Sequence, residues 1–204
     1  MWMSFLFISS MIDIRMREVD PIKRKNTIRL IAANGVIAAL YVVLTLITSP
    51  IAYSYMQFRV SELLCLLTFF NPWYTFGLTL GCLLANLFST VGPLDIAMGT
   101  AATLIACLMM ILCSKFVKIL AVNAIFPCLV NAAIVPAIIY LSTLGTDSVM
   151  LLTPETYFMM FGWVFLGEFL AIYAVGYPIF MILRRTYPNF EGLVLATQNA
   201  DFKW

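Results

Sequence analysis

Histidine is absent from the 204 residues of this protein, and charged side chains make up only 11% of them. Without histidine the chain can form neither a Ser-His-Asp triad nor a histidine-rich zinc site. It also lacks a G-x-x-x-x-G-K-S/T loop, so it cannot hydrolyse ATP by itself. No nucleophile–base pair is evident in the sequence. We therefore expect a protein that is not an enzyme and that holds no metal ion or cofactor.

Hydrophobic residues take the place of the missing charges. They form 63% of the chain, and the mean hydropathy is +0.98, whereas soluble domains carry roughly 25% charged residues. The sequence therefore predicts an integral membrane protein. A helix needs roughly 20 apolar residues to cross the hydrocarbon core, so there is room for about six spans and no separate soluble domain. The five cysteines lie inside apolar runs without metal-like spacing, which is typical of buried thiols.

Proline, glycine, asparagine and basic residues divide the hydrophobic sequence into six runs. The runs lie at about residues 28–48, 59–70, 73–90, 95–114, 119–143 and 155–183. We expect an all-α membrane domain of six transmembrane helices over residues 26–186. Residues 1–25 and 187–204 are expected to be tails on the same side of the membrane, because an even number of spans returns the chain to that side.

Basic residues gather on one face of this arrangement. They precede the first run, fill the turn between the fourth and fifth runs and close the sixth: Arg15, Arg17, Lys23, Arg24, Lys25, Arg29, Lys115, Lys118, Arg184 and Arg185. The opposite loops carry Asp147 and no lysine or arginine. The positive-inside rule therefore predicts that both termini are cytoplasmic. The net charge is only +2, and these clusters describe membrane orientation without favouring nucleic-acid binding.

The second run is too short to cross the membrane. Its dozen residues span roughly 18 Å, against a hydrocarbon core of roughly 30 Å. The outer end, with Arg59 and Glu62, is therefore expected to begin inside the membrane, and the loop before it to dip in. Irregular backbone at that depth is tolerated only where it is buried in protein or lines a cavity. We infer a pocket that opens to the outside.

Seven polar residues of the membrane region form the candidate substrate-binding site. They lie on five segments, in the outer half or near the midplane: Gln57, Arg59, Glu62, Asn86, Asp95, Asn131 and Glu168. Ionisable side chains in the membrane interior cost at least a few kcal/mol each, so they indicate function. Three carboxylates face one guanidinium, and Glu168 has no basic residue within a helical turn. A cationic or donor-rich ligand would complete such a site.

Most of these residues also have a structural interpretation. Arg59 and Glu62 are three residues apart and can neutralise each other. Asp95 precedes the fourth run and can act as the N-cap of its helix. Asn86 and Asn131 can join helices through hydrogen bonds. The sequence leaves both interpretations open.

The first run carries a patch of small residues. Ala32, Gly35 and Ala39 belong to it, and Gly35-x-x-x-Ala39 has the spacing that lets another helix approach closely. The patch can dock a partner protein, or it can pack against the chain's own helices.

Four stretches carry a pattern typical of a known family. They read AANGVIAALYVVLTLI, PIAYSYMQFRVSELLCLL, GLTLGCLLANLFS and GPLDIAMGTAATLIA. They resemble the QueT family of queuosine-precursor transporters, which are substrate-binding (S) components of energy-coupling factor (ECF) transporters. The resemblance covers about residues 30–110 densely, and its Q-F-R-x-S-E and L-D-I-x-x-G-T strings are fairly specific.

The resemblance implies a six-helix S-component fold with an outward-facing pocket, in a multi-pass protein of the bacterial plasma membrane. It implies partnership with a transmembrane coupling protein and two ATPase subunits, which would explain the missing ATP-binding loop. It also implies that the S component topples in the membrane to release its substrate inside. Small-residue patches on the first helix are the docking surface in this class, and here they correspond to Ala32, Gly35 and Ala39.

The ligand implied by the resemblance is the aminomethyl-deazaguanine precursor of queuosine. Its guanine-like edge offers adjacent N–H donors for a carboxylate, and its aminomethyl group is a cation. We expect Glu168 and one of Glu62 or Asp95 to divide these two tasks, and Arg59 to orient Glu62. The residues expected to read the remaining polar atoms of the ligand are Gln57, Asn86 and Asn131.

Two other functions stay open at this point. The chain can be an S component for another vitamin or purine-like base. It can also be a proton- or sodium-coupled secondary transporter, which likewise uses buried carboxylates. Dependence of uptake on ATPase partners or on an ion gradient separates the two classes.

Overall fold

The computed structural model describes residues 21–49, 58–89, 92–143 and 153–186. Within these ranges the chain is helical, with short turns and no strands, as the sequence predicts. The predicted tails lie outside the described residues, apart from the helical residues 21–25, and so does Gln57.

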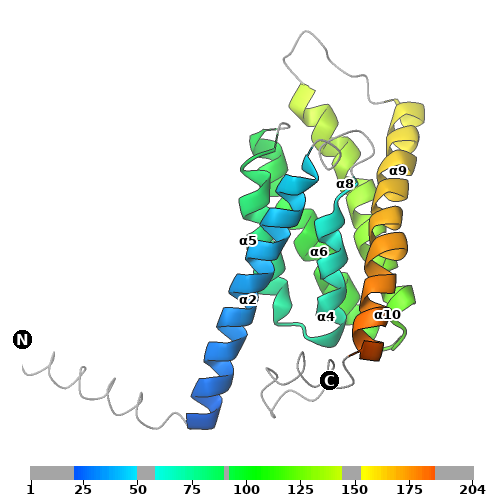
Figure 1. Ribbon diagram of the computed structural model, residues 1–204. Coiled ribbons are helices and arrows are strands. Elements are labelled where there is room, and N and C mark those ends of the chain that lie inside the picture. The colour runs from blue at the N-terminus through cyan, green and yellow to red at the C-terminus, as the bar shows by residue number, and fades with distance from the viewer. Residues whose placement is uncertain (1–20, 50–57, 90–91, 144–152, 187–204) are drawn as a thin grey trace, which may run out of the picture.

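The described elements are helices of three kinds. The α-helices are α2 (Pro21–Ile47), α4 (Leu67–Phe70), α5 (Tyr74–Asn86), α6 (Thr100–Ser114), α7 (Leu120–Asn123), α8 (Ile125–Thr143), α9 (Pro154–Phe169) and α10 (Tyr177–Thr186). A 3₁₀ helix, η1 (Val60–Leu66), leads into α4. Two π-helical turns, η2 (Asp95–Gly99) and η3 (Leu170–Gly176), precede α6 and α10. Successive segments run in opposite directions along the bundle (Figure 1).

Four stretches of the described residues are long and apolar enough to cross a membrane. They are Asn26–Ile47, Asp95–Ser114, Leu120–Ser142 and Pro154–Thr186. Val60–Phe70 is apolar but shorter, which confirms that the second run cannot cross alone. The helices thus support a multi-pass membrane protein, and the six crossings and their orientation stay predictions.

Two helix boundaries differ from the predicted runs. α2 already includes the residues from Pro21 onward, well before residue 28, because the lysines and arginines of this stretch have good helix propensity. α5 ends at Asn86 and not near residue 90. Tight turns follow it, in which the N–H groups of Phe88 and Ser89 bond three residues back at 3.1 Å each. Hydrophobicity indicates the lipid-embedded sequence, whereas local hydrogen bonds decide where a helix ends.

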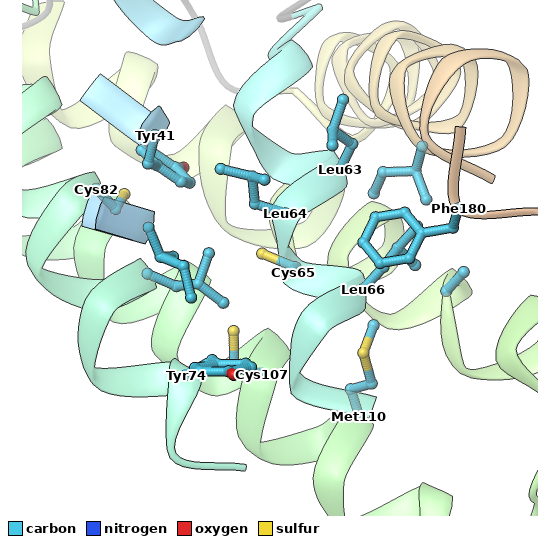
Figure 2. Close-up of a cluster of buried hydrophobic side chains, with 14 of the residues drawn as sticks. Tyr41, Leu63, Leu64, Cys65, Leu66, Tyr74, Cys82, Cys107, Met110 and Phe180 are labelled. Atoms are coloured by element: carbon cyan, nitrogen blue, oxygen red, sulfur yellow. The ribbon is translucent and has the colours of Figure 1, made fainter. Parts of the chain in front are cut away.

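The short segment formed by η1 and α4 runs through the bundle, with other helices on several sides (Figure 1). Four consecutive residues of η1, Leu63 to Leu66, are buried. The side chains packed around them come from neighbouring helices, as Figure 2 shows: Tyr41, Tyr74, Cys82, Cys107, Met110 and Phe180. A helix that is hydrophobic all round must be covered by other helices. The segment that is too short to span the membrane is therefore held by protein.

The outward faces of the long helices are hydrophobic as well. Large apolar side chains are exposed there: Val36 and Val43 of α2, Phe76 and Leu80 of α5, Leu108 and Leu112 of α6, and Phe158 and Trp163 of α9. In water such surface would cost about 25 cal/mol per Å², a cost that lipid removes. This distribution agrees with helices embedded in a bilayer.

Two glycines bring α2 and α5 very close together. A Cβ atom at Gly77 would lie 2.6 Å from the backbone oxygen of Asn34, and the N–H of Gly77 donates to the Asn34 side chain at 2.7 Å. A Cβ atom at Gly81 would lie 2.8 Å from Cβ of Tyr41 and 2.9 Å from the backbone oxygen of Ala38. Gly77-x-x-x-Gly81 is thus a close-packing pair inside the bundle. The sequence analysis did not single it out.

The small-residue patch of α2 faces away from this contact. Ala32, Gly35 and Ala39 are exposed. In the described part of the chain, no atom outside the helix's own backbone lies within 4 Å of the place where Gly35 would carry a Cβ. Internal packing therefore does not explain these residues. Docking of a partner stays their predicted role.

Candidate functional site

The polar residues predicted for the substrate site are buried inside the bundle. Six of them lie in the described residues, and each is at most 3% exposed: Arg59, Glu62, Asn86, Asp95, Asn131 and Glu168. Gln57, the seventh, lies outside the described residues. Buried polar groups need hydrogen-bond partners. Those partners divide the six residues into three clusters.

The arginine cluster consists of Arg59, Asn86, Ser89 and Asp95. Arg59 directly precedes η1, and its Nη2 lies 3.4 Å from Oδ2 of Asp95 and 3.1 Å from Oδ1 of Asn86. Asn86, the last residue of α5, donates to the backbone oxygen of Asp95 at 3.1 Å. Ser89 donates to Oδ2 of Asp95 at 2.5 Å. The cluster ties η1, α5 and η2 together, so Asn86 does join helices as its structural interpretation proposed.

The capping interpretation of Asp95 is wrong. Leu94 occupies the position before η2, and no side-chain cap bond is made there. The Asp95 carboxylate instead lies beside Arg59, because a buried guanidinium must be paired. The structure likewise pairs Arg59 with Asp95 where the sequence analysis considered Glu62 as its partner.

Gly99 provides the space in which the arginine cluster forms. A Cβ atom at this position would lie 2.7 Å from Oδ1 of Asp95 and 2.8 Å from Nδ2 of Asn86. Both distances are too short for a carbon atom, so only glycine lets the carboxylate and the amide occupy these places. This explains the glycine of the L-D-I-x-x-G-T string.

The Glu62 cluster contains neutral donors from three elements. Oε1 of Glu62 accepts from the Tyr41 hydroxyl of α2 at 2.5 Å and from the Thr103 hydroxyl of α6 at 3.1 Å. Oε2 accepts from the Cys65 thiol at 3.0 Å, which is a weak donor. Tyr41 and Thr103 therefore hold the carboxylate that Arg59 was expected to orient.

The Glu168 cluster is smaller. Oε1 of Glu168, on α9, accepts from Nδ2 of Asn131, on α8, at 3.0 Å. Oε2 is buried and has no hydrogen-bond partner among the described residues. A carboxylate oxygen that is buried without a donor is costly. Asn131 joins α8 and α9, as its structural interpretation proposed. It donates to only one of the two carboxylate oxygens of Glu168.

The three clusters share one region of the bundle. Arg59 and Glu62 belong to the start of η1, and η1 packs against η3, which follows α9 and Glu168 directly. A Cβ atom at Gly176 of η3 would lie 2.7 Å from Cβ of Leu63, so the two segments touch closely.

The charges of this region do not balance. Among the described residues, one ion pair is present in it, between Arg59 and Asp95. The recorded hydrogen bonds of Glu62 and Glu168 come only from neutral side chains. Within the part of the chain that the structure describes, neither Glu62 nor Glu168 forms an ion pair, and their role in binding a cation stays a prediction.

The sequence analysis missed the partners of Glu62. Tyr41, Thr103 and Cys65 carry no charge and lie in apolar runs. In such runs a tyrosine usually belongs to the interfacial aromatic belt, and a threonine usually packs against a neighbouring helix. The sequence nevertheless contained a signal for Tyr41, because the polar Thr45 follows it by four residues. In the structure, the hydroxyl of Thr45 donates to Oγ of Ser61, on η1, at 2.7 Å. Polar residues repeating every four positions indicated a face turned toward other polar groups.

Comparison with known proteins identifies the family of this chain. The family model described as QueT transporter matches residues 31–185. The chain belongs to the QueT transporter family. A QueT-family protein is a transporter and not an enzyme, in agreement with the absence of a nucleophile–base pair from the sequence.

A curated relative of this QueT-family chain is the "Queuosine precursor transporter QueT" of Lactococcus lactis subsp. cremoris (strain MG1363). It is 41% identical over 73 residues, which are 35% of this chain and 43% of the relative. The aligned stretch thus spans less than half of that relative. No solved structure matches the chain.

The matched region of the QueT-family chain includes all three clusters. It begins at Ile31, so the basic start of α2 lies before it, and it ends at Arg185 near the end of α10. The buried acids, the asparagines and Gly99 therefore belong to the part of the chain that follows the family pattern.

Proposed function

We propose that this protein is the S component of an ECF importer that captures a queuosine precursor, an aminomethyl-deazaguanine, outside the cell and releases it inside. Membership of the QueT family and the name of the relative support a queuosine-precursor substrate. The observation that carries the site is Oε2 of Glu168, a buried carboxylate oxygen without a donor among the described residues. A ligand that brings N–H donors would satisfy it.

The chemistry of the ligand fits the two carboxylates without cationic partners. One of them would bind the aminomethyl cation, and the other the paired N–H donors of the guanine-like edge. Glu168 offers Oε2, and Glu62 offers Oε2, which receives only the weak thiol donor of Cys65. Asp95 is engaged by Arg59, so Glu62 is the better candidate for the second carboxylate.

The membrane arrangement is part of the proposal. The protein crosses the bacterial plasma membrane six times with both termini in the cytoplasm, and its pocket opens outward. The alternating direction of the segments supports this topology (Figure 1). So does a cavity lined by both Lys118 and Arg184, because two groups of basic residues then lie at one end of the bundle.

Energy would come from partner proteins. The chain has no ATP-binding loop, so a transmembrane coupling protein and two ATPase subunits would drive release by toppling the S component. The exposed patch of Ala32, Gly35 and Ala39 supports docking on α2, because small residues let a partner helix approach closely.

Ligand binding to the purified protein tests the site. Calorimetry with aminomethyl-deazaguanine, guanine and the nitrile analogue is expected to show selective binding of the aminomethyl compound. Glu168→Gln and Glu62→Gln are each expected to weaken binding roughly 10- to 100-fold, because a hydrogen bond to a charged group contributes about 1.5–3 kcal/mol.

Glu155→Gln is the matched control, since Glu155 is an exposed carboxylate in the first turn of α9. It is expected to leave affinity unchanged. Wild-type affinity in both Glu168→Gln and Glu62→Gln would show that the site is elsewhere. Failure of all three compounds to bind folded protein would point to an S component for another substrate.

Uptake in cells tests the energy source. Accumulation of labelled ligand is expected to stop when the ATPase partners are deleted and to continue when an ionophore collapses the ion gradients. The opposite result would favour an ion-coupled secondary transporter.

A further inference from the structure

A cavity lies at the end of the bundle where Lys118 and Arg184 are found, away from the three polar clusters. Its volume is about 290 Å³, and it is formed by the end of α4, the start of α7 and one side of α10 from Tyr177 to Arg184. Seven of its nine lining residues are apolar or aromatic, including Phe70, Leu120 and Met181. The other two are Lys118 and Arg184.

Packing fixes the walls of this cavity. The rings of Phe70 and Phe180 are stacked, with centroids 6.1 Å apart and planes 1° from parallel. The chain between α6 and α7, which carries Lys118, is held by Asn123. Its Nδ2 donates to the backbone oxygens of Val117 at 2.7 Å and Ile119 at 2.9 Å. Hydrogen bonds to the residues before and after Lys118 therefore hold its backbone in place.

The two charged residues that line the cavity in the described part of the chain are both basic. Lys118 and Arg184 are both exposed, and no acidic residue of the described chain lines the cavity. The cations lie at the ends of membrane-embedded helices, where the bilayer meets water. The site thus combines two cations with apolar walls at a membrane surface.

We propose that this cavity binds an anionic phospholipid. Lys118 and Arg184 contact its phosphate headgroup, and the first carbons of its acyl chains lie against the aromatic and aliphatic walls. Basic pockets between helices at a membrane surface suit such headgroups. The volume is near the lower limit of roughly 300 Å³ for ligand pockets, so the rest of the acyl chains stays in the bilayer. A free phosphate ion has no apolar part that could pack against the apolar walls.

Native mass spectrometry of the purified full-length protein tests the proposal. Phosphatidylglycerol is expected to be retained in preference to phosphatidylcholine with the same chains. The double variant Lys118→Gln, Arg184→Gln is expected to bind phosphatidylglycerol roughly thirtyfold more weakly, because each basic residue contributes about 1 kcal/mol near an anionic lipid. Met181→Trp, which fills the cavity and keeps both charges, is expected to weaken binding as well.

The matched control is Lys115→Gln, Arg185→Gln, which removes two exposed charges at the same end that do not line the cavity. Equal loss in this control would show diffuse attraction to a basic surface and overturn the site. Equal retention of phosphatidylcholine would overturn the role of the phosphate charge. Full competition by soluble glycerol phosphate would overturn the lipid as occupant. The proposal does not depend on the transported substrate, because the assay contains none.

Discussion

At the scale of single residues, two buried glutamates differ in how they are satisfied. Within the described residues, Glu62 receives hydrogen bonds from Tyr41, Thr103 and Cys65, whereas Glu168 receives one from Asn131 and keeps an oxygen without a donor. A satisfied buried acid contributes to stability, and an unsatisfied one costs stability unless a ligand completes it. Glu62 therefore stabilises the bundle even without a ligand, whereas Glu168 depends on a ligand for its second partner.

Replacement of each glutamate by methionine is expected to separate these roles. Glu62→Met leaves the Tyr41 and Thr103 hydroxyls without an acceptor, and we expect a loss of at least about 2 kcal/mol in the free energy of unfolding. Glu168→Met removes an unsatisfied oxygen and leaves one amide group of Asn131 unpaired, so its stability is expected to change by less than about 1 kcal/mol. Unfolding in detergent, followed by circular dichroism without ligand, measures both values. Equal destabilisation of the two variants would contradict this assignment.

At the scale of elements, the two sides of α2 have different tasks. One side lies against α5 through Gly77 and Gly81, where the backbones approach too closely for a side chain. The other side presents Ala32, Gly35 and Ala39 without a partner in the described chain. Small residues occur on both sides, so composition alone could not tell internal packing from an available surface.

Alanine substitution is expected to distinguish the two sides. In Gly81→Ala the new methyl group would lie 2.8 Å from Cβ of Tyr41, and we expect a loss of about 1–3 kcal/mol from overpacking. Gly35→Ala meets open space and is expected to be neutral, or to stabilise by up to about 1 kcal/mol through helix propensity. Unfolding of both variants in the same detergent gives the comparison. A larger loss for Gly35→Ala than for Gly81→Ala would show that the described α2–α5 contact is wrong.

At the scale of the whole molecule, one short segment determines the arrangement. The η1–α4 segment cannot cross the membrane, so longer helices surround it, and its start brings Arg59 and Glu62 into contact with α2, α5, α6 and η2. Lys118 and Arg184 line one cavity at the other end of this segment, beside Phe69 and Phe70. The start of the segment thus lies in the buried polar region, and its end lies at a cavity lined by two basic residues.

Cysteine labelling is expected to show which end faces the cytoplasm. Glu155, at the start of α9, and Lys115, at the end of α6, are exposed near opposite ends of the bundle. In a background with Cys113→Ser, which removes the described cysteine that is not buried, Glu155→Cys should react with an impermeant maleimide in intact cells. Lys115→Cys should react only after permeabilisation. The reverse pattern would show that the orientation is inverted.

The sequence by itself determined the class of this protein and supplied the residues that are proposed for its site. Hydrophobic composition, breakers between runs and charges inside apolar sequence are properties of single residues and their neighbours, and the QueT pattern is visible in the same local strings. The segment near residues 59–70 was correctly predicted to be too short, because helix length follows directly from residue count.

Only the tertiary structure decided which buried groups meet. Asp95 pairs with Arg59 because π-helical η2 and the missing side chain of Gly99 bring it there, and Glu62 turns to Tyr41 and Thr103, which lie 21 and 41 positions away. Such pairs depend on how helices pack across the bundle, and sequence spacing holds no information about that contact. Only the packed helices show that one oxygen of Glu168, on which the proposed substrate site rests, has no donor among the described residues.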